Sequence, residues 1–248
     1  MASNRATIYL KKLAKWAVIT AIWVAVWQLL SIFAGHEVLL PSPFTTFRRL
    51  LQLLGELPFY YAIGATFLRV FAGFFLGALF GALLAAICYW LSWAQALFAP
   101  LLAVCRSTPF ASFIILALLW IRVDYVPVFT ATIMSLPIFY EGVWEGMETV
   151  DDGMLHMARL YNFKRRDILL FIYLPSIRPY FMAAMASSLG LSFKTGVAAE
   201  VISSPKYAIG GLLSNAKVYL ETTDLFAVTA ALIILSVLME RLLRRLVG

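Results

Sequence analysis

Long apolar runs, separated by short polar segments, recur along the whole chain. An α-helix needs about 20 mostly apolar residues to cross the hydrocarbon core of a bilayer. Six runs come close to or exceed this length: residues 16–35, 70–91, 93–121, 125–146, 179–199 and 225–241. The pattern predicts an all-α integral membrane protein with about six transmembrane helices, forming a single domain over residues 1–248.

The third run contains both a charge and a proline. Arg106 lies near the middle of residues 93–121, and a helix of about 15 residues, which is what each half supplies, spans only roughly 22 Å. The hydrocarbon core is roughly 30 Å thick. We therefore expect one long, tilted helix that is interrupted at Thr108 and Pro109, because proline removes a helical hydrogen bond. Pro137 is expected to bend the fourth span for the same reason.

Two shorter segments between the runs are amphipathic. The first follows Ser42, which can cap a helix, and Pro43, which suits the first helical position. We expect residues 43–54 to form a helix on the external face of the membrane, with an apolar side made of Phe44, Phe47, Leu51 and Leu54. The second segment, residues 154–167, is predicted to form a short cytoplasmic helix with an apolar face made of Met154, Met157, Ala158 and Tyr161.

Composition and charge agree with a membrane protein and predict its orientation. Hydrophobic residues make up 62% of the chain and charged residues 13%, whereas soluble domains carry roughly 45–50% and about 25%. The net charge of +7 comes from short basic clusters beside the apolar runs, which is typical of membrane topology rather than nucleic-acid binding.

The positive-inside rule places both termini in the cytoplasm, because twelve Lys and Arg residues then lie inside and six outside. The twelve are Arg5, Lys11, Lys12, Lys15, Arg159, Lys164, Arg165, Arg166, Arg178, Arg241, Arg244 and Arg245. The six are Arg48, Arg49, Arg69, Arg122, Lys206 and Lys217.

Three ionisable residues and two neighbours are candidates for a transport path or gate. Arg106 and Lys194 fall inside predicted spans and Glu200 lies at the outer end of the fifth, where charges are costly and usually face the protein interior or a watery cavity. Lys194 and Glu200 are six positions apart and face different sides of a helix, so each is expected to pair across helices. Structural ion pairs and a role in the path are the two alternatives. An Arg106 that faces inward beside Thr108 and Pro109 would favour an anionic substrate.

Small residues recur on one face of the second run. Gly73, Gly77 and Gly81 are four positions apart, and such glycines let helices approach closely. They are expected to support helix packing. The partner is either another helix of the same chain, which we favour, or a second copy of the chain.

Residues that could support catalysis or metal binding do not form a convincing set. Cys88 and Cys105 lie in apolar runs, where cysteine behaves as a small hydrophobic residue, and His36 is far from His156. The sequence contains no G-x-x-x-x-G-K-[ST] phosphate-binding loop, so it is not predicted to hydrolyse ATP by that route. The pattern therefore favours a membrane protein without catalysis, cofactor or metal of its own, rather than a membrane-embedded enzyme.

The segment between the fourth and fifth runs resembles a known signature. Permease subunits of binding-protein-dependent ABC importers carry a cytoplasmic E-A-A motif, followed after three residues by glycine and after nine more by I-x-L-P. The corresponding positions here are His156, Met157, Ala158, Asn162, Ile172, Leu174 and Pro175. His156 departs from the acidic residue and Asn162 from the glycine, although Asn enters the left-handed conformation more easily than other residues. The resemblance implies that these positions, together with Met154 and Tyr161, couple the chain to an ATPase.

Other stretches are similar to the sulfonate, taurine, nitrate and bicarbonate subfamily of these importers: residues 40–43, 66–70, 108–109, 193–194 and 197–200. The resemblance covers nearly the whole chain. It implies the type I importer fold, a homodimeric pore in the bacterial inner membrane and an extracytoplasmic substrate-binding protein. It also implies two separate ABC ATPase subunits, which bind ATP and Mg.

The resemblance implies a small solute as cargo, of the sulfonate, taurine, nitrate, bicarbonate or thiamine-precursor type. The basic cluster at residues 164–166 is expected to contact anionic membrane lipids or the ATPase surface. A stand-alone secondary transporter is a further alternative, but such proteins favour inverted repeats, and no obvious repeat is present in the sequence.

Overall fold

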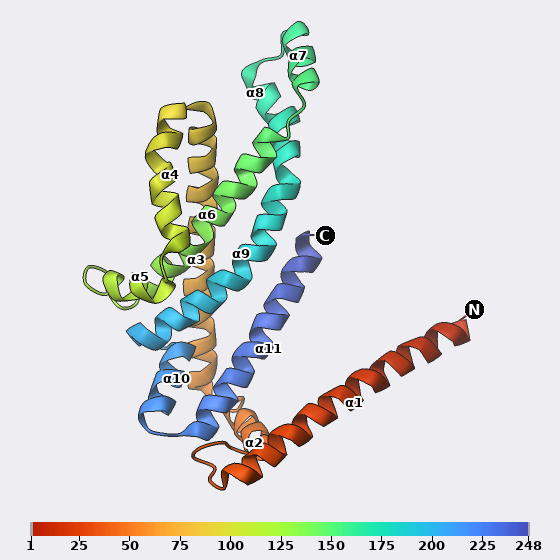
Figure 1. Ribbon diagram of the computed structural model, residues 1–248, viewed down its shortest axis with the longest axis vertical. Helices are drawn as coiled ribbons and strands as arrows, with labels where there is room; N and C mark the ends of the chain where they lie inside the picture. Colours follow the sequence, from red (N-terminus) through yellow and green to blue (C-terminus); the bar gives the residue numbers. More distant parts are fainter. Residues whose placement is uncertain (1, 248) are drawn as a thin grey trace. The chain divides into compact units, whose positions relative to one another are not determined.

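The computed structural model describes the backbone of residues 2–247 and the side chains of residues 14–242 and 245. Every regular element among these residues is a helix (Figure 1). Residues 1 and 248 lie outside this description, as do four side chains counted in the charge analysis: Arg5, Lys11, Lys12 and Arg244. The chain divides into two compact units, Met1–Leu57 with Asn215–Leu232, and Pro58–Ser214 with Ile233–Gly248.

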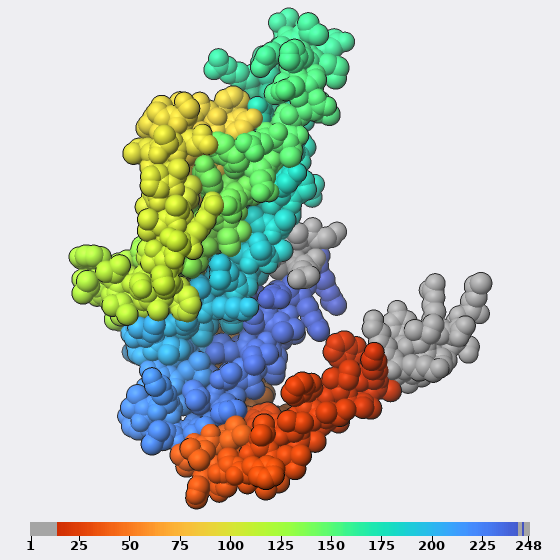
Figure 2. Space-filling model, in the orientation of Figure 1, coloured from red at the N-terminus to blue at the C-terminus, as the bar shows by residue number. Residues whose placement is uncertain are grey.

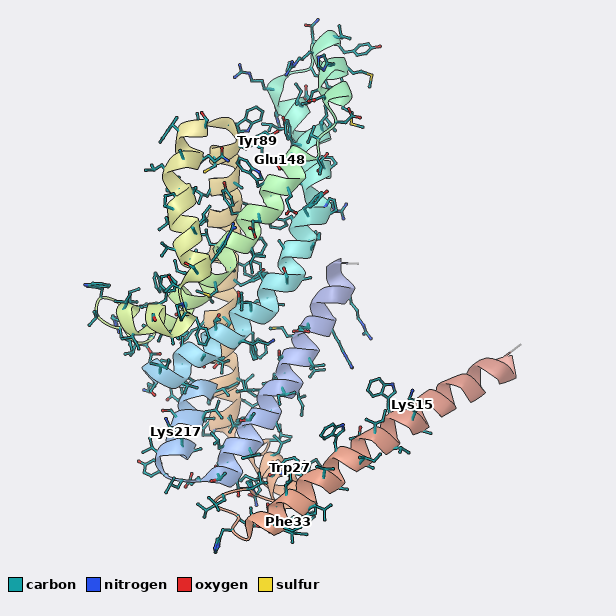
Figure 3. All side chains as sticks on the ribbon, viewed as in Figure 1. Lys15, Trp27, Phe33, Tyr89, Glu148 and Lys217 are labelled. Carbon is teal, nitrogen blue, oxygen red and sulfur yellow. The ribbon has the colours of Figure 1, made fainter. Side chains whose placement is uncertain are left out.

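The first unit contains α1 (Ala2–Ala34), α2 (Pro43–Leu53) and the beginning of α11 (Thr222–Val247). Trp27, labelled on α1 in Figure 3, donates a hydrogen bond from Nε1 to the carbonyl oxygen of Pro41 at 3.1 Å. Its ring lies 5.8 Å from the ring of Phe226 on α11. Arg49 on α2 donates two hydrogen bonds to the carboxylate of Asp224, at 2.6 and 2.8 Å. These contacts join all three helices of the unit.

The start of α2 has the predicted cap. The hydroxyl oxygen of Ser42 accepts a hydrogen bond from the backbone N–H of Thr45 at 3.1 Å, and Pro43 occupies the first turn, where its missing N–H costs nothing. The helix ends at Leu53, one residue before the predicted end. Phe44 and Phe47 are exposed on its apolar side, so the position of this helix at a membrane surface stays a prediction.

The second unit contains α3 (Leu57–Trp90), α4 (Ser92–Ser107), α5 (Phe110–Ala117), α6 (Val126–Glu148), α7 (Asp152–Leu160), α8 (Arg165–Ile168), a π-helical turn η1 (Leu169–Tyr173), α9 (Leu174–Ser203) and the beginning of α10 (Ile209–Val218). Figure 1 shows α6 and α9 side by side, with α3 next to α6. Three rings mark the centre of this packing, because Phe139 on α6 lies 5.4 Å from Phe74 on α3 and 5.2 Å from Phe181 on α9. The core of the unit therefore forms where these three helices meet.

Within the described chain, five helices are long and apolar enough to cross a membrane: Ala14–Ala34, Leu57–Trp90, Val126–Glu148, Arg165–Ser203 and Thr222–Leu242. A sixth span results if α4 and α5 are counted as one broken span. This number agrees with the predicted total of about six.

The third predicted span is wrong in one respect. The chain breaks at Thr108 and Pro109 as expected, but α4 and α5 are bent by 105° at this break instead of continuing as one tilted helix. Thr108 has an extended conformation, with φ of −78° and ψ of 131°. A residue that precedes proline is pushed out of the helical region by the proline ring, and this explains why the helix ends at this point.

Two further boundaries differ from the prediction. α3 begins at Leu57 rather than at residue 70, so Arg69 lies inside the helix and not in a loop. α9 begins at Leu174 rather than at residue 179, and α10 was not predicted at all. A single charged residue ends an apolar run in the sequence but need not end the helix. Its long side chain can pair with a residue on another helix, as Arg69 does with Glu200.

Candidate coupling segment and buried ion pair

The segment that connects α6 to α9 contains α7, α8 and η1, and it extends past the turn between α3 and α4 (Figures 1 and 2). Asp151 caps α7, because its side-chain oxygen accepts a hydrogen bond from the backbone N–H of Gly153 at 2.6 Å. α7 ends at Leu160, and Asn162 follows in the left-handed region with a φ of 54°. The structure therefore places at the glycine position of the signature a residue that tolerates this backbone conformation.

The prediction of one continuous helix over residues 154–167 is wrong. A left-handed residue ends a helix, since its carbonyl no longer points along the helix axis, and the chain turns at Asn162. The backbone N–H of Phe163 then donates to the carbonyl oxygen of Ala158 at 2.9 Å. The next helix, α8, begins at Arg165.

The predicted apolar face of this segment divides into two faces. Met154, Met157 and Tyr161 are 52%, 57% and 76% exposed, whereas Ala158 is only 3% exposed. Ala158 is therefore buried and does not share a free surface with the other three. His156 is exposed, and its Nδ1 lies 2.8 Å from the backbone carbonyl oxygen of Asp152 in the same helix. The free apolar face of α7 is formed by the two methionines and the tyrosine.

The I-x-L-P positions lie where the loop joins the long helix α9. Ile172 is half-buried and Leu174 is 56% exposed, whereas Tyr173, which lies between them in the sequence, is buried. η1 directly precedes Pro175. A proline has no N–H and its ring clashes with the carbonyl four residues earlier, so a wider π-turn relieves the crowding at this point. Pro175 thereby shapes the connection between the loop and the span.

A buried ion pair joins three helices in the second unit. Glu200 on α9 is fully buried, and its Oε1 accepts a hydrogen bond from Nη1 of Arg69 on α3 at 3.0 Å. Its Oε2 accepts from the hydroxyl of Thr66 at 2.8 Å and from the backbone N–H of Gly210 at 3.2 Å. Thr66 in turn accepts from the backbone N–H of Ile209 at 3.1 Å, at the beginning of α10. The carboxylate thus has partners on both oxygens.

Arg69 also fixes the turn between α9 and α10. Its two terminal nitrogens donate to the backbone carbonyl oxygens of Tyr207 at 3.1 Å and Lys206 at 2.7 Å. Arg69 was not predicted as a site residue, because its charge ends an apolar run and placed it in an external loop. Its place in the matched stretch at residues 66–70 was the signal that could have identified it.

The two cations that were predicted to lie inside the membrane, Arg106 and Lys194, have different environments. Arg106 at the end of α4 forms an ion pair with Glu141 on α6, so its charge is neutralised within the chain. Lys194 is exposed on α9 and forms no ion pair with any described side chain. Thr108 and Pro109 form the break between α4 and α5, and Pro109 is exposed. Glu200 pairs across helices as expected, and the described side chains offer Lys194 no such partner.

The three spaced glycines lie against α6 of the same chain. A Cβ at Gly73 would collide with the backbone oxygen of Val128, and one at Gly77 would collide with the hydroxyl of Ser135. A Cβ at Gly81 would lie 2.5 Å from the backbone oxygen of Leu136. The glycines therefore let α3 and α6 approach within contact distance of their backbones.

The several apolar spans and the charges paired between helices are those of a multi-pass membrane protein. Residues 73–247 match the model of the family described as "Binding-protein-dependent transport system inner membrane component". The chain belongs to this family, and it is a permease subunit of an ABC importer in the inner membrane.

Individual relatives agree with this assignment. The chain is similar to the putative aliphatic sulfonates transport permease protein SsuC of Escherichia coli (strain K12), with 31% identity over 84% of this chain and 82% of the relative. The taurine transport system permease protein TauC of the same strain is 24% identical over 93% of this chain and 84% of the relative.

Solved structures show the same fold. One is an amino acid ABC transporter crystallised with histidines, with a TM-score of 0.60, 16% identity and coverage of 73% of this chain and 87% of that chain. Another is the inward-facing MetNI methionine ABC transporter, with a TM-score of 0.58, 18% identity and coverage of 76% and 92%. The fold is thus that of type I ABC importer permeases.

Proposed function

We propose that two copies of this chain form the pore of an importer that moves a small sulfonate- or taurine-type solute into the cell. Two separate ATPase subunits, which bind ATP and Mg, would supply the energy, and an external binding protein would deliver the solute. In this proposal both termini and α7 lie on the cytoplasmic side. The names of the relatives SsuC and TauC support the solute class. A relative named as the nitrate import permease protein NrtB keeps nitrate as a second candidate.

The free apolar face of α7 is the observation that carries the coupling role. Met154, Met157 and Tyr161 are exposed at the tip of the loop that joins two spans. Apolar residues at helical spacing on a water-facing helix suit a groove on a soluble partner. A partner that binds this helix can move α6 and α9, because the loop is continuous with both. A secondary transporter or an embedded enzyme would have no use for such a face.

The free cation on α9 supports an anionic solute. Lys194 shares an exposed face with Ser187 and Leu191, and the described part of the chain does not cover that face. Arg106 is less suited to attract an anion, since Glu141 already neutralises its charge. We therefore assign the attraction of the solute to Lys194, with α9 lining the path between the two copies. Thr108 and Pro109 would contribute to the path through the break between α4 and α5.

Met157→Asp is expected to reduce retention of the ATPase by about tenfold, because an interface core does not tolerate an unpaired charge. The measurement is a pull-down of the ATPase with the detergent-solubilised permease, together with solute uptake in vesicles. Met157→Leu is the matched control and should keep both, since it stays apolar and of similar volume. Wild-type retention and uptake by the Asp variant would refute docking on this face of α7.

Lys194→Met is expected to lower kcat/KM for uptake of a labelled alkanesulfonate by about tenfold, equivalent to ~1.4 kcal/mol of lost attraction. Lys194→Arg should retain most of the uptake because it keeps the charge. Basal ATP hydrolysis and ATPase retention should be unchanged in both variants, since α7 is untouched. Equal uptake by the Met variant and the wild type would show that Lys194 does not contact the solute.

A further inference from the structure

A groove with a cationic rim lies at the α7 end of the second unit. Its volume is about 610 Å³, and it is lined by Arg159, Arg165 and the apolar side chains of Trp90, Leu155, Ile168 and Leu169. Its walls come from the end of α3, from α7 and from the α8–η1 connection. The proposed docking of the ATPase uses none of these residues.

The two arginines are available to a ligand. Both are exposed, and neither forms an ion pair with a described side chain. No acidic residue is among those that line the groove. Guanidinium groups bind phosphate oxygens in a two-pronged geometry, which makes a pair of unpartnered arginines a good phosphate site.

The groove lies at the ends of two candidate spans. Trp90 is the last residue of α3 and is 58% exposed, and Arg165 is the first residue of the span that includes α9. Tryptophan is enriched at the boundary between hydrocarbon and water. Leu169, which is 47% exposed, continues the apolar wall toward the membrane. The groove therefore offers cations at headgroup level and apolar side chains at the level of acyl chains.

We infer that this groove binds an anionic phospholipid, with the phosphate between Arg159 and Arg165 and an acyl chain along Trp90 and Leu169. The inference rests on the proposed orientation, in which this end faces the cytoplasm. Basic pockets between membrane helices on that side bind anionic headgroups. The docking face of α7 stays free, because Leu155 and Arg159 are four positions apart on a different side of the helix from Met157. A bound lipid would thus hold the base of α7 without blocking the ATPase.

The test is a lipid titration of the purified permease without ATPase, with bound lipid counted by native mass spectrometry. The probes are phosphatidylglycerol and phosphatidylcholine with identical acyl chains. Each arginine that hydrogen-bonds directly to the phosphate contributes about a factor of five in affinity. We expect Arg159→Gln/Arg165→Gln to weaken phosphatidylglycerol binding by about 25-fold and to leave phosphatidylcholine binding unchanged.

Lys164→Gln/Arg166→Gln is the matched control, since it removes two charges from the same loop but not from the groove. It should bind phosphatidylglycerol within about twofold of the wild type. Arg159→Lys/Arg165→Lys keeps the charge and should retain most of the preference for phosphatidylglycerol over phosphatidylcholine. This result would show that substitution at the two positions does not itself unfold the groove. Equal losses in the two Gln pairs, or an equal affinity of the wild type for both lipids, would overturn the lipid site.

The same variants separate this inference from the coupling proposal. Suppose that Arg159→Gln/Arg165→Gln loses the ATPase in a pull-down but still binds phosphatidylglycerol. The two arginines would then contact an acidic surface of the ATPase, and the lipid site would be overturned. Retention of the ATPase by that pair, with loss of the lipid preference, would support it. Failure of the Met157→Asp test would affect only the coupling role, because the lipid titration contains no ATPase.

Discussion

Arg69→Met is expected to lower the free energy of unfolding by about 3–5 kcal/mol, because it leaves the fully buried carboxylate of Glu200 without its charged partner. Arg69 is itself mostly buried, with 14% of its side chain exposed, so water screens the pair little. The substitution also removes the donors to the carbonyl oxygens of Lys206 and Tyr207, and this frees the turn before α10. Denaturant titration in detergent micelles measures the loss.

Two further variants define the cause of that loss. Arg122→Met is the control, since Arg122 is 80% exposed and only touches Asp124 at 4.0 Å; its effect should stay below about 0.5 kcal/mol. Arg69→Met/Glu200→Gln should recover much of the stability, because a neutral amide oxygen can still accept from Thr66 and Gly210. If the double variant is no more stable than Arg69→Met, an unpaired charge is not the source of the defect.

The contact between Arg69 and Glu200 could not be predicted from the sequence. Hydropathy assigned Arg69 to a loop, because a charge ends an apolar run, and it placed Glu200 at the outer end of a span without naming a partner. The two residues are 131 positions apart, and only the packing of α3 beside α9 brings them together. A run of apolar residues reports the environment of a helix and not the identity of its neighbour. The matched stretch at residues 66–70 indicated that Arg69 had a role, but its contact could not be derived.

The segment between α6 and α9 was predicted only in part, for a different reason. Its place, its cap and its left-handed Asn162 follow from local rules that depend on a few neighbouring residues. The burial of Ala158 does not follow from such local rules. Spacing of i, i+3 and i+4 shows which residues share one side of a helix, but not which of them are buried by the rest of the chain. The chain turns back at Phe163, whose backbone N–H donates to the carbonyl oxygen of Ala158, and Ala158 is buried while Met157 is exposed. The variant that tests docking is therefore Met157→Asp and not a substitution of Ala158.

Local chemistry predicted the breaks and caps of the chain better than its long-range contacts. The cap at Ser42 and the interruption at Thr108 and Pro109 are both set by one or two residues, and both are present. The angle of 105° at that interruption depends on how α5 packs against α6 and α9, which no local pattern contains. The glycine face on α3 was predicted from spacing, and packing within the same chain was the favoured of two alternatives. That the partner helix is α6 was not predicted.

Gly81→Leu is expected to destabilise the permease by about 3 kcal/mol, because the added side chain has no space between α3 and α6. The first atom alone would lie 2.5 Å from the backbone oxygen of Leu136 and 2.9 Å from Cβ of Phe139. Neither neighbour can move cheaply, since one is backbone and the other belongs to the buried ring at the centre of the unit. The expected readout is a lower midpoint of denaturation and a reduced yield of folded protein in detergent.

Gly64→Leu is the matched control on the same helix, because a Cβ at Gly64 meets no atom within 4 Å. It should be neutral or slightly stabilising, since leucine forms helices better than glycine by up to about 1 kcal/mol. If Gly81→Leu unfolds like the wild type but dimerises poorly, the glycine face serves the contact between copies. If it changes neither property, α3 and α6 do not pack through their glycines, and the close approach of the two backbones needs another cause. The difference between the two leucine variants thus isolates steric fit from helix propensity.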